Sequence, residues 1–389
     1  MDNAATTSTA PEVVSAMLPF FTEYYGNPSS VYNFAQKSKM AIEDAREIIA
    51  DSIGAAKSNE IYFTGGGSES DNWALKSAAF GLRNKGNHII TTKIEHHAIL
   101  NTCAYLEKNG FEITYLDVDS EGFVSLEDVE NAITEKTILI SVMFANNEIG
   151  TIEPVCEIGE IAHKHGILFH TDAVQAMCHV PINVTEMNID LLSASAHKFH
   201  GPKGVGFMYM KNSAKLEPFI HGGAQERARR AGTSNVPGIV GMGQAVKLAL
   251  STLDKDTHTI INMRNYIVDR ILGEIPDVTF DGPCIDANAV SAGSPAGSLK
   301  RLPSNMHFCF KDVSGDSLLI MLDMNGICAS SGSACAAGSI DPSHVLLAIG
   351  RSKGETKGAL RLSIDKNLTK EDADYAIDAL KAAVARLRG

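Results

Sequence analysis

Three short stretches carry groups that could take part in one reaction. They hold a glycine-rich turn, a carboxylate and a lysine. The stretch FTGGGSESDNWAL (63–75) is typical of a strand, a glycine turn and a helix. Glycines let the backbone approach a ligand, and the free N–H groups of a helix N-terminus attract an anion. We expect Gly66, Gly67 and Ser68 to make these contacts. The turn has neither the P-loop pattern nor the dinucleotide pattern, so taken alone it also fits an ordinary helix start.

The carboxylate and the lysine follow two other apolar runs. HTDAVQA (170–176) places Asp172 at the end of one predicted strand, and SASAHKFHGPKGVG (193–206) places Lys198 at the end of another. Ligands of open parallel sheets bind beyond the carboxyl ends of the strands, so these groups and the glycine turn can face one crevice. A phosphate site, a Schiff-base lysine and an acid for a pyridinium nitrogen are what pyridoxal phosphate requires. Spacing alone does not choose between Lys198 and Lys203, although the adjacent histidine favours Lys198.

A lone thiol is the fourth reactive group. The stretch SSGSACAAGS (330–339) holds Cys335 among small side chains that cannot build a core. Because a structural cysteine normally has bulky apolar neighbours, we expect a mobile loop over about 330–341 that carries a reactive thiol. The seven cysteines lack the spacing of a metal site, and we predict no metal. We expect Cys328, the rival nucleophile, to be a small buried side chain.

The elements that must position these groups are those of an α/β protein. Short apolar runs alternate with helical patterns over the first two thirds of the chain, which predicts a mostly parallel sheet covered by helices. The interval 196–204 is too short for a crossover helix, so one strand there should run antiparallel. After about residue 250, we expect a smaller α+β region with a helix over about 251–273, three strands and a last helix capped by Thr369. The strands predicted for the larger region are 61–63, 88–92, 112–118, 137–144, 167–171, 190–196 and 204–210.

Length and charge narrow the class of protein. The chain has 389 residues and a net charge of −12. The length predicts two domains or one large domain with an appendage. The division that we expect is a large cofactor-binding domain over 15–250 and a small domain of 1–14 and 251–389 that carries the cysteine loop. The acidic balance argues against direct nucleic-acid binding, and we expect no membrane span. Scattered cysteines without a leader segment are typical of a reduced, cytoplasmic protein.

Ten motifs occur in a characteristic order. They are DNAATT (2–7), YGNPSS (25–30), TGGGSESDN (64–72), EHHAI (95–99), NNEIGT (146–151), HTDAVQA, SAHKFHGPKGVG, RRAGTSN (229–235), SSGSAC and ALRLS (359–363). Together they make the chain resemble, over nearly its whole length, the cysteine desulfurases of the nitrogen-fixation and iron–sulfur-cluster type, within the class V aminotransferase family. The resemblance implies fold type I of the pyridoxal-phosphate enzymes, which is aspartate aminotransferase-like, with a mostly parallel, seven-stranded mixed sheet in the large domain.

The resemblance also implies how the cofactor, pyridoxal phosphate, is held. Lys198 forms the Schiff base, Asp172 keeps the pyridine nitrogen protonated, and Gln175 bonds the ring hydroxyl. His96 stacks on the ring and moves protons. The remaining cofactor contacts come from Asn147 and, at the phosphate, from Gly67, Ser68, Ser195, His197 and Thr233 of the neighbouring subunit in a homodimer.

Substrate and product follow from the same resemblance. Asn147 and Arg361 bind L-cysteine, the arginine through its planar fork on the carboxylate. Cys335 attacks the substrate sulfur, which gives L-alanine and a persulfide on Cys335. The sulfur then passes to an acceptor protein, either an iron–sulfur scaffold or an enzyme of thio-cofactor or tRNA thiolation. The stretch around Cys335 has no basic residue to lower the thiol pKa, so we expect the site that it visits to activate it, with His96 as the candidate.

Three alternatives stay open. A selenocysteine lyase or a short-loop desulfurase tends to carry its cysteine in an Arg-x-Gly-His-His-Cys context, which differs from that of Cys335. An ordinary class V aminotransferase or lyase would leave Cys335 without a role. A non-catalytic binding protein on the same fold would have no need for Lys198, Asp172 and Cys335 together.

Overall fold

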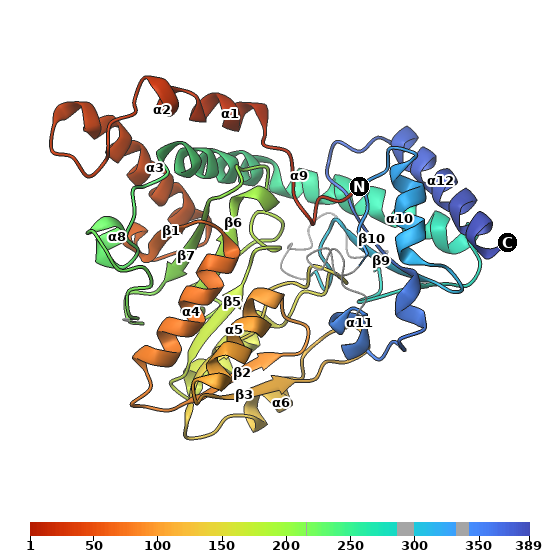
Figure 1. Ribbon diagram of the computed structural model, residues 1–389, viewed down its shortest axis with the longest axis horizontal. Helices are drawn as coiled ribbons and strands as arrows, with labels where there is room; N and C mark the ends of the chain where they lie inside the picture. Colours follow the sequence, from red (N-terminus) through yellow and green to blue (C-terminus); the bar gives the residue numbers. More distant parts are fainter. Residues whose placement is uncertain (215, 286–298, 332–341) are drawn as a thin grey trace.

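The computed structural model describes residues 1–214, 216–285, 299–331 and 342–389. Its centre is a seven-stranded sheet with the strand order β1-β7-β6-β5-β4-β2-β3, with helices on both faces (Figure 1). The strands are β1 (Ile61–Thr64), β2 (His88–Thr92), β3 (Glu112–Leu116), β4 (Thr137–Ser141), β5 (Leu168–Asp172), β6 (Leu191–Ser195) and β7 (Gly206–Met210). The ends of each strand differ from the predicted ends by at most three residues.

The strand directions confirm the predicted mixed sheet. β7 pairs antiparallel with both β6 and β1, as the short interval before it requires, and the other neighbours are parallel. Phe207 and Tyr209 of β7 belong to one core, whereas Met208 belongs to the core of the opposite face. This alternation follows from the two-residue period of a strand and shows that both faces of the sheet are buried.

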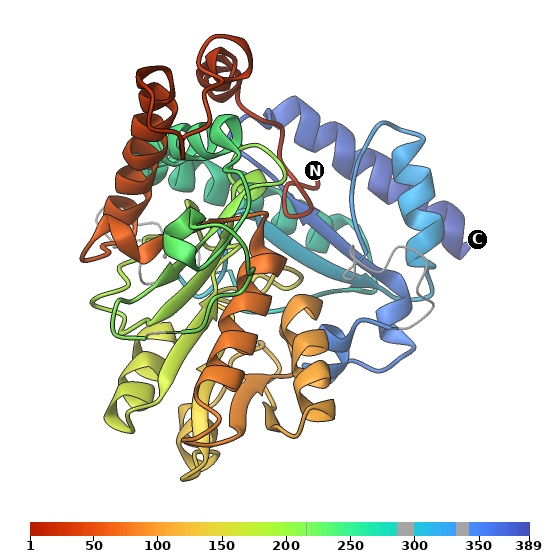
Figure 2. The same ribbon diagram turned by 60° about the vertical axis from the view of Figure 1, so that its left-hand side comes forward.

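Helices cover the two faces in separate groups (Figure 2). α3 and α7 contribute to the core on one face, and α4 and α5 to the core on the other. The helices up to β7 and just beyond it are α1 (Pro11–Met17), α2 (Pro19–Thr22), α3 (Gln36–Ser52), α4 (Gly67–Gly81), α5 (His97–Lys108), α6 (Leu126–Asn131), α7 (Val155–Lys164) and α8 (Gln225–Ala228).

A second, three-stranded antiparallel sheet with the order β10-β9-β8 follows the long helix α9 (Val236–Glu274). Thr369 caps the last helix through a reciprocal bond with Asp372, as predicted. The elements of this region are β8 (Val278–Phe280), β9 (Asn305–Phe310), β10 (Ala359–Ser363), α10 (Gly315–Asp323), α11 (His344–Ala348) and α12 (Lys370–Arg388).

α9 begins at Val236 and not at about 251 as predicted. By length and composition alone it could cross a membrane. Its first half, however, buries Ile239 and Met242 in the core beside the large sheet, and its second half buries Ile267 and Ile271 in the core of the small sheet. Its apolar residues are thus explained by core packing. The division into two domains at residue 250 stays a prediction, because α9 runs through that point.

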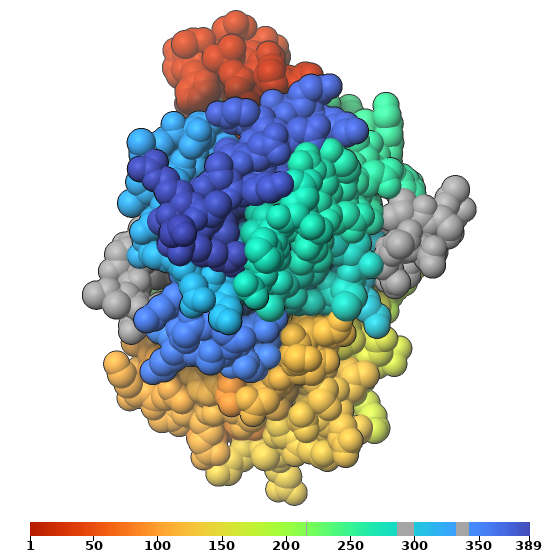
Figure 3. All heavy atoms as spheres, turned by 90° about the vertical axis from the view of Figure 1, so that its right-hand side faces the viewer, coloured from red at the N-terminus to blue at the C-terminus, as the bar shows by residue number. Residues whose placement is uncertain are grey.

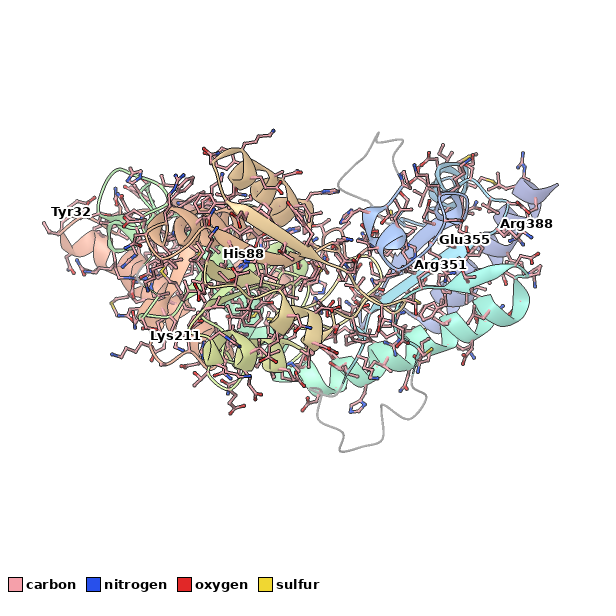
Figure 4. All side chains as sticks on the ribbon, turned by 90° about the horizontal axis from the view of Figure 1, so that it is seen from below. Tyr32, His88, Lys211, Arg351, Glu355 and Arg388 are labelled. Atoms are coloured by element: carbon pink, nitrogen blue, oxygen red, sulfur yellow. The ribbon has the colours of Figure 1, made fainter. Side chains whose placement is uncertain are left out.

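The N-terminal helices project from the body of the molecule (Figure 3). Tyr32, in the segment between α2 and α3, lies at the end of the molecule opposite Arg388 (Figure 4). We call residues 14–40 the N-terminal arm. Its exposed apolar side chains are Val14, Leu18, Phe21, Tyr25, Val31, Tyr32, Phe34 and Met40.

The first residues of the chain join the two sheets. We call residues 2–7 the N-terminal segment. The N–H of Ala4 donates to Ser363 Oγ (2.8 Å), and the N–H of Asn3 donates to the carbonyl oxygen of Ser363 (3.3 Å). At the other end, the N–H of Thr7 donates to the carbonyl oxygen of His197 (2.9 Å). The N-terminal segment therefore lies between β10 and the turn after β6.

Candidate active site

A cavity of about 290 Å³ lies beyond the carboxyl ends of the central parallel strands. It is the place where an open α/β sheet binds its ligands. Residues of the large sheet, the N-terminal segment and the small sheet all reach it. The predicted site residues that line this cavity are Gly67, Ser68, His96, Asn147, Asp172, Gln175, Ser195, His197, Lys198 and Arg361.

The glycine turn between β1 and α4 is shaped for the close approach of a ligand. Gly66 has a φ of 149°, which L side chains rarely adopt. A Cβ on Gly67 would lie 2.4 Å from Val174 Cγ2, so a larger residue would displace the loop after β5. Gly66 offers no side-chain cap to the first turn of α4. The N–H groups of that turn are therefore left for an anion, and Ser195 Oγ lies beside the same turn.

Two of the buried carboxyl groups that line the cavity, those of Asp71 and Asp172, lie close together. One oxygen of Asp71, one oxygen of Asp172 and a ring nitrogen of His96 lie within 4.8 Å of one another. Burial raises the pKa of Asp71 well above its ordinary value, and the nearby Asp172 raises it further. Burial also raises the pKa of Asp172, but His96, the N–H of Val174 and Lys198 oppose this rise. We therefore assign the proton to Asp71 and the negative charge to Asp172.

Lys198 ends a short turn, Ala196–Lys198, that follows β6 directly. Its Nζ donates to the carbonyl oxygens of Ala4 (2.6 Å) and Ala5 (3.0 Å). Gln175 Nε2 donates to the same carbonyl of Ala4 at 3.0 Å. Backbone oxygens of the N-terminal segment thus position both polar side chains at the cavity wall.

His197 lies in the same turn as Lys198, with its Nδ1 3.1 Å from Thr6 Oγ1. Burial lowers the pKa of His197 to about 4, and the charges of Lys198 and Lys203 contribute to this. The ring is therefore neutral near pH 7, and it can contact an anion only as a hydrogen-bond donor.

His96 caps α5 with its side chain. Its Nδ1 accepts the N–H of Ala98 at 3.1 Å, so a neutral ring carries its proton on Nε2. The preceding Glu95 is buried, and its Oε1 accepts from the N–H of Met143 and from Thr92 Oγ1, both at 2.9 Å. Burial raises the pKa of Glu95 well above its ordinary value. This shift favours the neutral form of Glu95.

Arg361 reaches the cavity from β10, with a side chain that is only 2% exposed. One terminal nitrogen donates to the carbonyl oxygen of Asn147 (2.9 Å), and the other donates to Asp2 Oδ1 (3.1 Å). Its Nε has no hydrogen-bond partner within the described part of the chain. The guanidinium is thus held by the turn after β4 and by the N-terminal segment, in an orientation fixed before any carboxylate arrives.

Among the described residues, two predicted site residues do not line this cavity: Gly66 and Thr233. Thr233 is exposed, in a segment that Arg230 attaches to the first turn of α4 through Glu69 (2.8 and 3.1 Å). Cys335 and most of its predicted loop lie outside the described residues. Cys328 is exposed, so our expectation of a buried thiol there was wrong. The preceding Ile327 is the side chain that turns into the core of the small sheet.

Several residues that line the cavity had no role in the sequence reasoning. Asp71 belongs to the motif TGGGSESDN, and Ala4 and Ala5 belong to DNAATT, so their presence in motifs was the only available signal. His344, beyond the cysteine stretch, carried no signal of its own. The others are Glu95, His97, Met143, Ala145, Glu148 and Val174.

The cavity fits pyridoxal phosphate. The uncapped first turn of α4 suits a phosphate, the charged Asp172 suits a pyridinium nitrogen, and Lys198 suits the aldehyde. Asp71 Oδ1 is buried without a hydrogen-bond partner among the described residues, as expected beside a ligand-binding space. The volume is on the scale of a small-molecule site.

Comparisons with known proteins agree with this assignment. The sequence model of the family "Aminotransferase class-V" matches residues 1–376. The protein named cysteine desulfurase IscS from Clostridium botulinum (strain Hall) is 54% identical over 388 residues, which cover 100% of this chain and 94% of that protein. The protein of the same name from Methanosarcina thermophila is 51% identical, with coverage of 100% and 92%.

Solved structures give the same result. A structure described as "NIFS-LIKE PROTEIN" has a TM-score of 0.90 at 36% identity, and the match covers 99% of this chain and 98% of that chain. One described as "SspA in complex with cysteine" has a TM-score of 0.79 at 37% identity, with coverage of 95% and 99%. The chain therefore belongs to the class V aminotransferase family, with a fold like that of the NifS-like proteins.

Proposed function

We propose that this protein is a pyridoxal-phosphate-dependent cysteine desulfurase, which converts L-cysteine to L-alanine and retains the sulfur as a persulfide on Cys335. The observation that carries the proposal is the convergence of Lys198, Asp172 and Arg361 in one cavity. Full-length relatives named cysteine desulfurase and a similar structure described with cysteine support the choice of substrate.

Different residues of the cavity contact different parts of the proposed cofactor. Gly67, Ser68, Ser195 and His197 would hold the phosphate of the cofactor, Asp172 would pair with its ring nitrogen, and Gln175 would bond its hydroxyl. When bound, pyridoxal phosphate supplies an electron sink for bond cleavage in an amino acid. Lys198 would anchor the cofactor through its aldehyde, and His96 would contact its ring.

Substrate orientation comes from the small sheet. The Arg361 fork binds the carboxylate of L-cysteine in a bidentate contact, and Asn147 lies next to it. The hydrogen bonds from Arg361 to the Asn147 carbonyl and to Asp2 fix the position of the guanidinium group. This fixes the α-carbon of the substrate relative to Lys198.

The overall reaction is balanced without an external oxidant or reductant. The thiol of Cys335 forms an S–S bond with the substrate sulfur, and the C–S bond of the substrate breaks. The hydrogen that the two thiols lose ends on the β-carbon, which becomes the methyl group of L-alanine. A persulfide S–H remains on Cys335, and its outer sulfur then passes to the thiol of an acceptor protein, either an iron–sulfur scaffold or a thiolation enzyme.

We infer that two subunits share their active sites. The exposed apolar side chains of the N-terminal arm, with Val31 at 96% and Tyr25 at 69%, form a surface that a second copy would cover. Thr233 is exposed and fits a role at the phosphate of the partner's cavity. A mixed dimer of a Lys198→Ala chain and a Thr233→Ala chain should regain one intact site and about half of the activity. A mixed dimer no more active than its parents would refute the sharing.

The net charge of −12 disfavours direct contact with nucleic acid, which is also negatively charged. We therefore propose that the sulfur acceptor is a protein. A persulfide cycle requires a reduced thiol, which favours a cytoplasmic location.

The decisive experiment is turnover of L-cysteine with alanine and persulfide sulfur measured together. We expect one alanine per sulfur from the wild type, and loss of both products from Cys335→Ser and Lys198→Ala. Cys328→Ser is the matched control, because Cys328 is an exposed thiol to which the proposal gives no role, and this variant should stay active. Equal alanine from Cys335→Ser, or transamination of alanine without sulfur release, would refute the proposal.

A further inference from the structure

Two imidazole rings on the cavity wall are not used by the function proposed above. His97 begins α5 and His344 begins α11, and both line the cavity. Their ring centroids lie 4.8 Å apart, with an angle of 50° between the ring planes. His344 therefore brings a titratable group from the region of the small sheet to the site of the large sheet.

Hydrogen bonds decide where the proton lies on His96 and on His344. Nδ1 of His96 is occupied by the N–H of Ala98, so this ring cannot take up a second proton without breaking that bond. His344 Nε2 lies 2.9 Å from the carbonyl oxygen of Glu95. A carbonyl only accepts, so Nε2 must be the donor and the lone pair of the neutral ring is on Nδ1. Within the described residues, no hydrogen bond occupies this Nδ1.

The charges around His344 keep it neutral near pH 7. Burial lowers its pKa, the bond to the Glu95 carbonyl opposes this, and His97 and His96 lower the pKa further. Burial raises the pKa of Glu95, which favours the neutral form of this neighbouring carboxyl group. The carboxylate of Glu148 faces the start of α11 and bonds Ser343 Oγ at 2.5 Å. His344 is thus a neutral imidazole with an available lone pair, which is the state that a general base needs.

We propose that His344 is a catalytic base that takes a proton from the ammonium nitrogen of the incoming L-cysteine. The proposal rests on the proposed function. An amino acid arrives with its amine protonated, and the nitrogen must be neutral before it can act as a nucleophile. In the proposed step an N–H bond of the substrate breaks, its electron pair stays on the substrate nitrogen, and the proton binds His344 Nδ1. The imidazolium later returns this proton to solvent.

Position supports this role. Arg361 fixes the carboxylate of the substrate, and the amine is only one carbon away from it. Ser343, next to His344, bonds Glu148, and Arg361 bonds the carbonyl of the adjacent Asn147. The turn after β4 therefore contacts both Arg361, which binds the carboxylate, and Ser343, the residue before the proposed base.

His344→Gln tests the proposal, because glutamine can still donate to the Glu95 carbonyl but has no basic nitrogen. We expect kcat/KM for L-cysteine to fall about 100-fold or more, and added imidazole to restore several-fold of the loss. The wild type should lose activity as the pH falls through the lowered pKa of His344, and the variant should lack this decline. Ser343→Ala is the matched control: it disturbs the same helix start, so any loss it causes should not respond to imidazole.

Nitrogen NMR of the histidine rings gives a readout that needs no turnover. At pH 7.5 we expect His344 to carry its proton on Nε2 with Nδ1 unprotonated, and to titrate below pH 6.5. A proton on Nδ1, a His344→Gln enzyme with normal kcat/KM, or a loss that imidazole does not restore would overturn the proposal. These outcomes presuppose an active wild type, whereas a wild type that forms no alanine from L-cysteine would refute the proposed function instead.

Discussion

Glu153 allows a prediction whose size follows from the structure. It is 4% exposed, its Oε2 accepts the N–H of Val124 at 3.1 Å, and its Oε1 has no hydrogen-bond partner among the described residues. Burial raises its pKa from 4.5 to about 8, and the charge of Asp119 adds to this. The folded protein therefore keeps a proton at pH 7 that the unfolded chain has lost.

The sign of the effect follows from proton linkage. Between pH 4.5 and about 8 the folded state binds more protons than the unfolded state, so the free energy of unfolding falls as the pH rises. Each pH unit costs about 1.36 kcal/mol, so the whole interval of about 3.5 pH units costs at most about 5 kcal/mol. Glu153→Gln keeps the shape and the acceptor for Val124 but removes this proton.

Thermal unfolding at several pH values measures the difference. At pH 4 Glu153→Gln and the wild type should unfold at similar temperatures. At pH 8.5 the variant should be the more stable, by on the order of 5 °C to 10 °C. Glu157→Gln, which changes an exposed carboxylate nearby, is the control and should leave the pH dependence unaltered. A constant difference between Glu153→Gln and the wild type from pH 4 to pH 8.5 would refute the reasoning.

Three further predictions concern the cavity. Gly67→Ala should weaken pyridoxal phosphate binding about 10-fold or more in an absorbance titration, because its Cβ meets Val174 Cγ2 at 2.4 Å; Val174→Ala in the same chain should restore part of the affinity, and no restoration would argue against that clash. Arg361→Lys should raise KM for L-cysteine about 10-fold to 100-fold, since charge-assisted bonds contribute about 1.5–3 kcal/mol; an unchanged KM in steady-state assays would place the carboxylate elsewhere. Asp172→Asn should lower kcat far more than Asp71→Asn at pH 7, because the negative charge lies on Asp172; the reverse order of the two rates would contradict that assignment.

The sequence predicted the large sheet well because its strands are short, apolar and bounded by helical patterns. It predicted the antiparallel end of the sheet from loop length alone. The start of α9 was missed because Gly241 and Gly243 are typical of a loop. In the structure a Cβ on Gly243 would lie 2.8 Å from that of Ala45, and one on Gly241 would lie 2.6 Å from Met17 Sδ. These glycines allow α9 to pack closely against α1 and α3, which is a tertiary effect that no local pattern reports.

In the candidate site, too, some features could be predicted from local sequence patterns and others depend on tertiary packing. Side chains at strand ends, such as Asp172 and Lys198, could be placed from the sequence because the topology of the sheet brings them together. The carbonyl oxygens of Ala4 and Ala5 could not, because a backbone acceptor has no residue type that marks it. His344 needed the packing of α11 against α5 before its ring could be assigned to the cavity.

The pairing of the first residues with β10 also sets an order of events during synthesis. Asn3 and Ala4 bond Ser363, which is synthesised about 360 residues later in the chain. At about 10 residues per second, the N-terminal segment waits on the order of half a minute for this partner. Until then the N-terminal segment is not held by Ser363, and its Ala4 carbonyl is not fixed as the acceptor for Lys198 and Gln175. The cavity wall can therefore be complete only after residue 363 has been synthesised, and a nascent chain stalled before residue 359 would have every strand of the large sheet but an incomplete cavity.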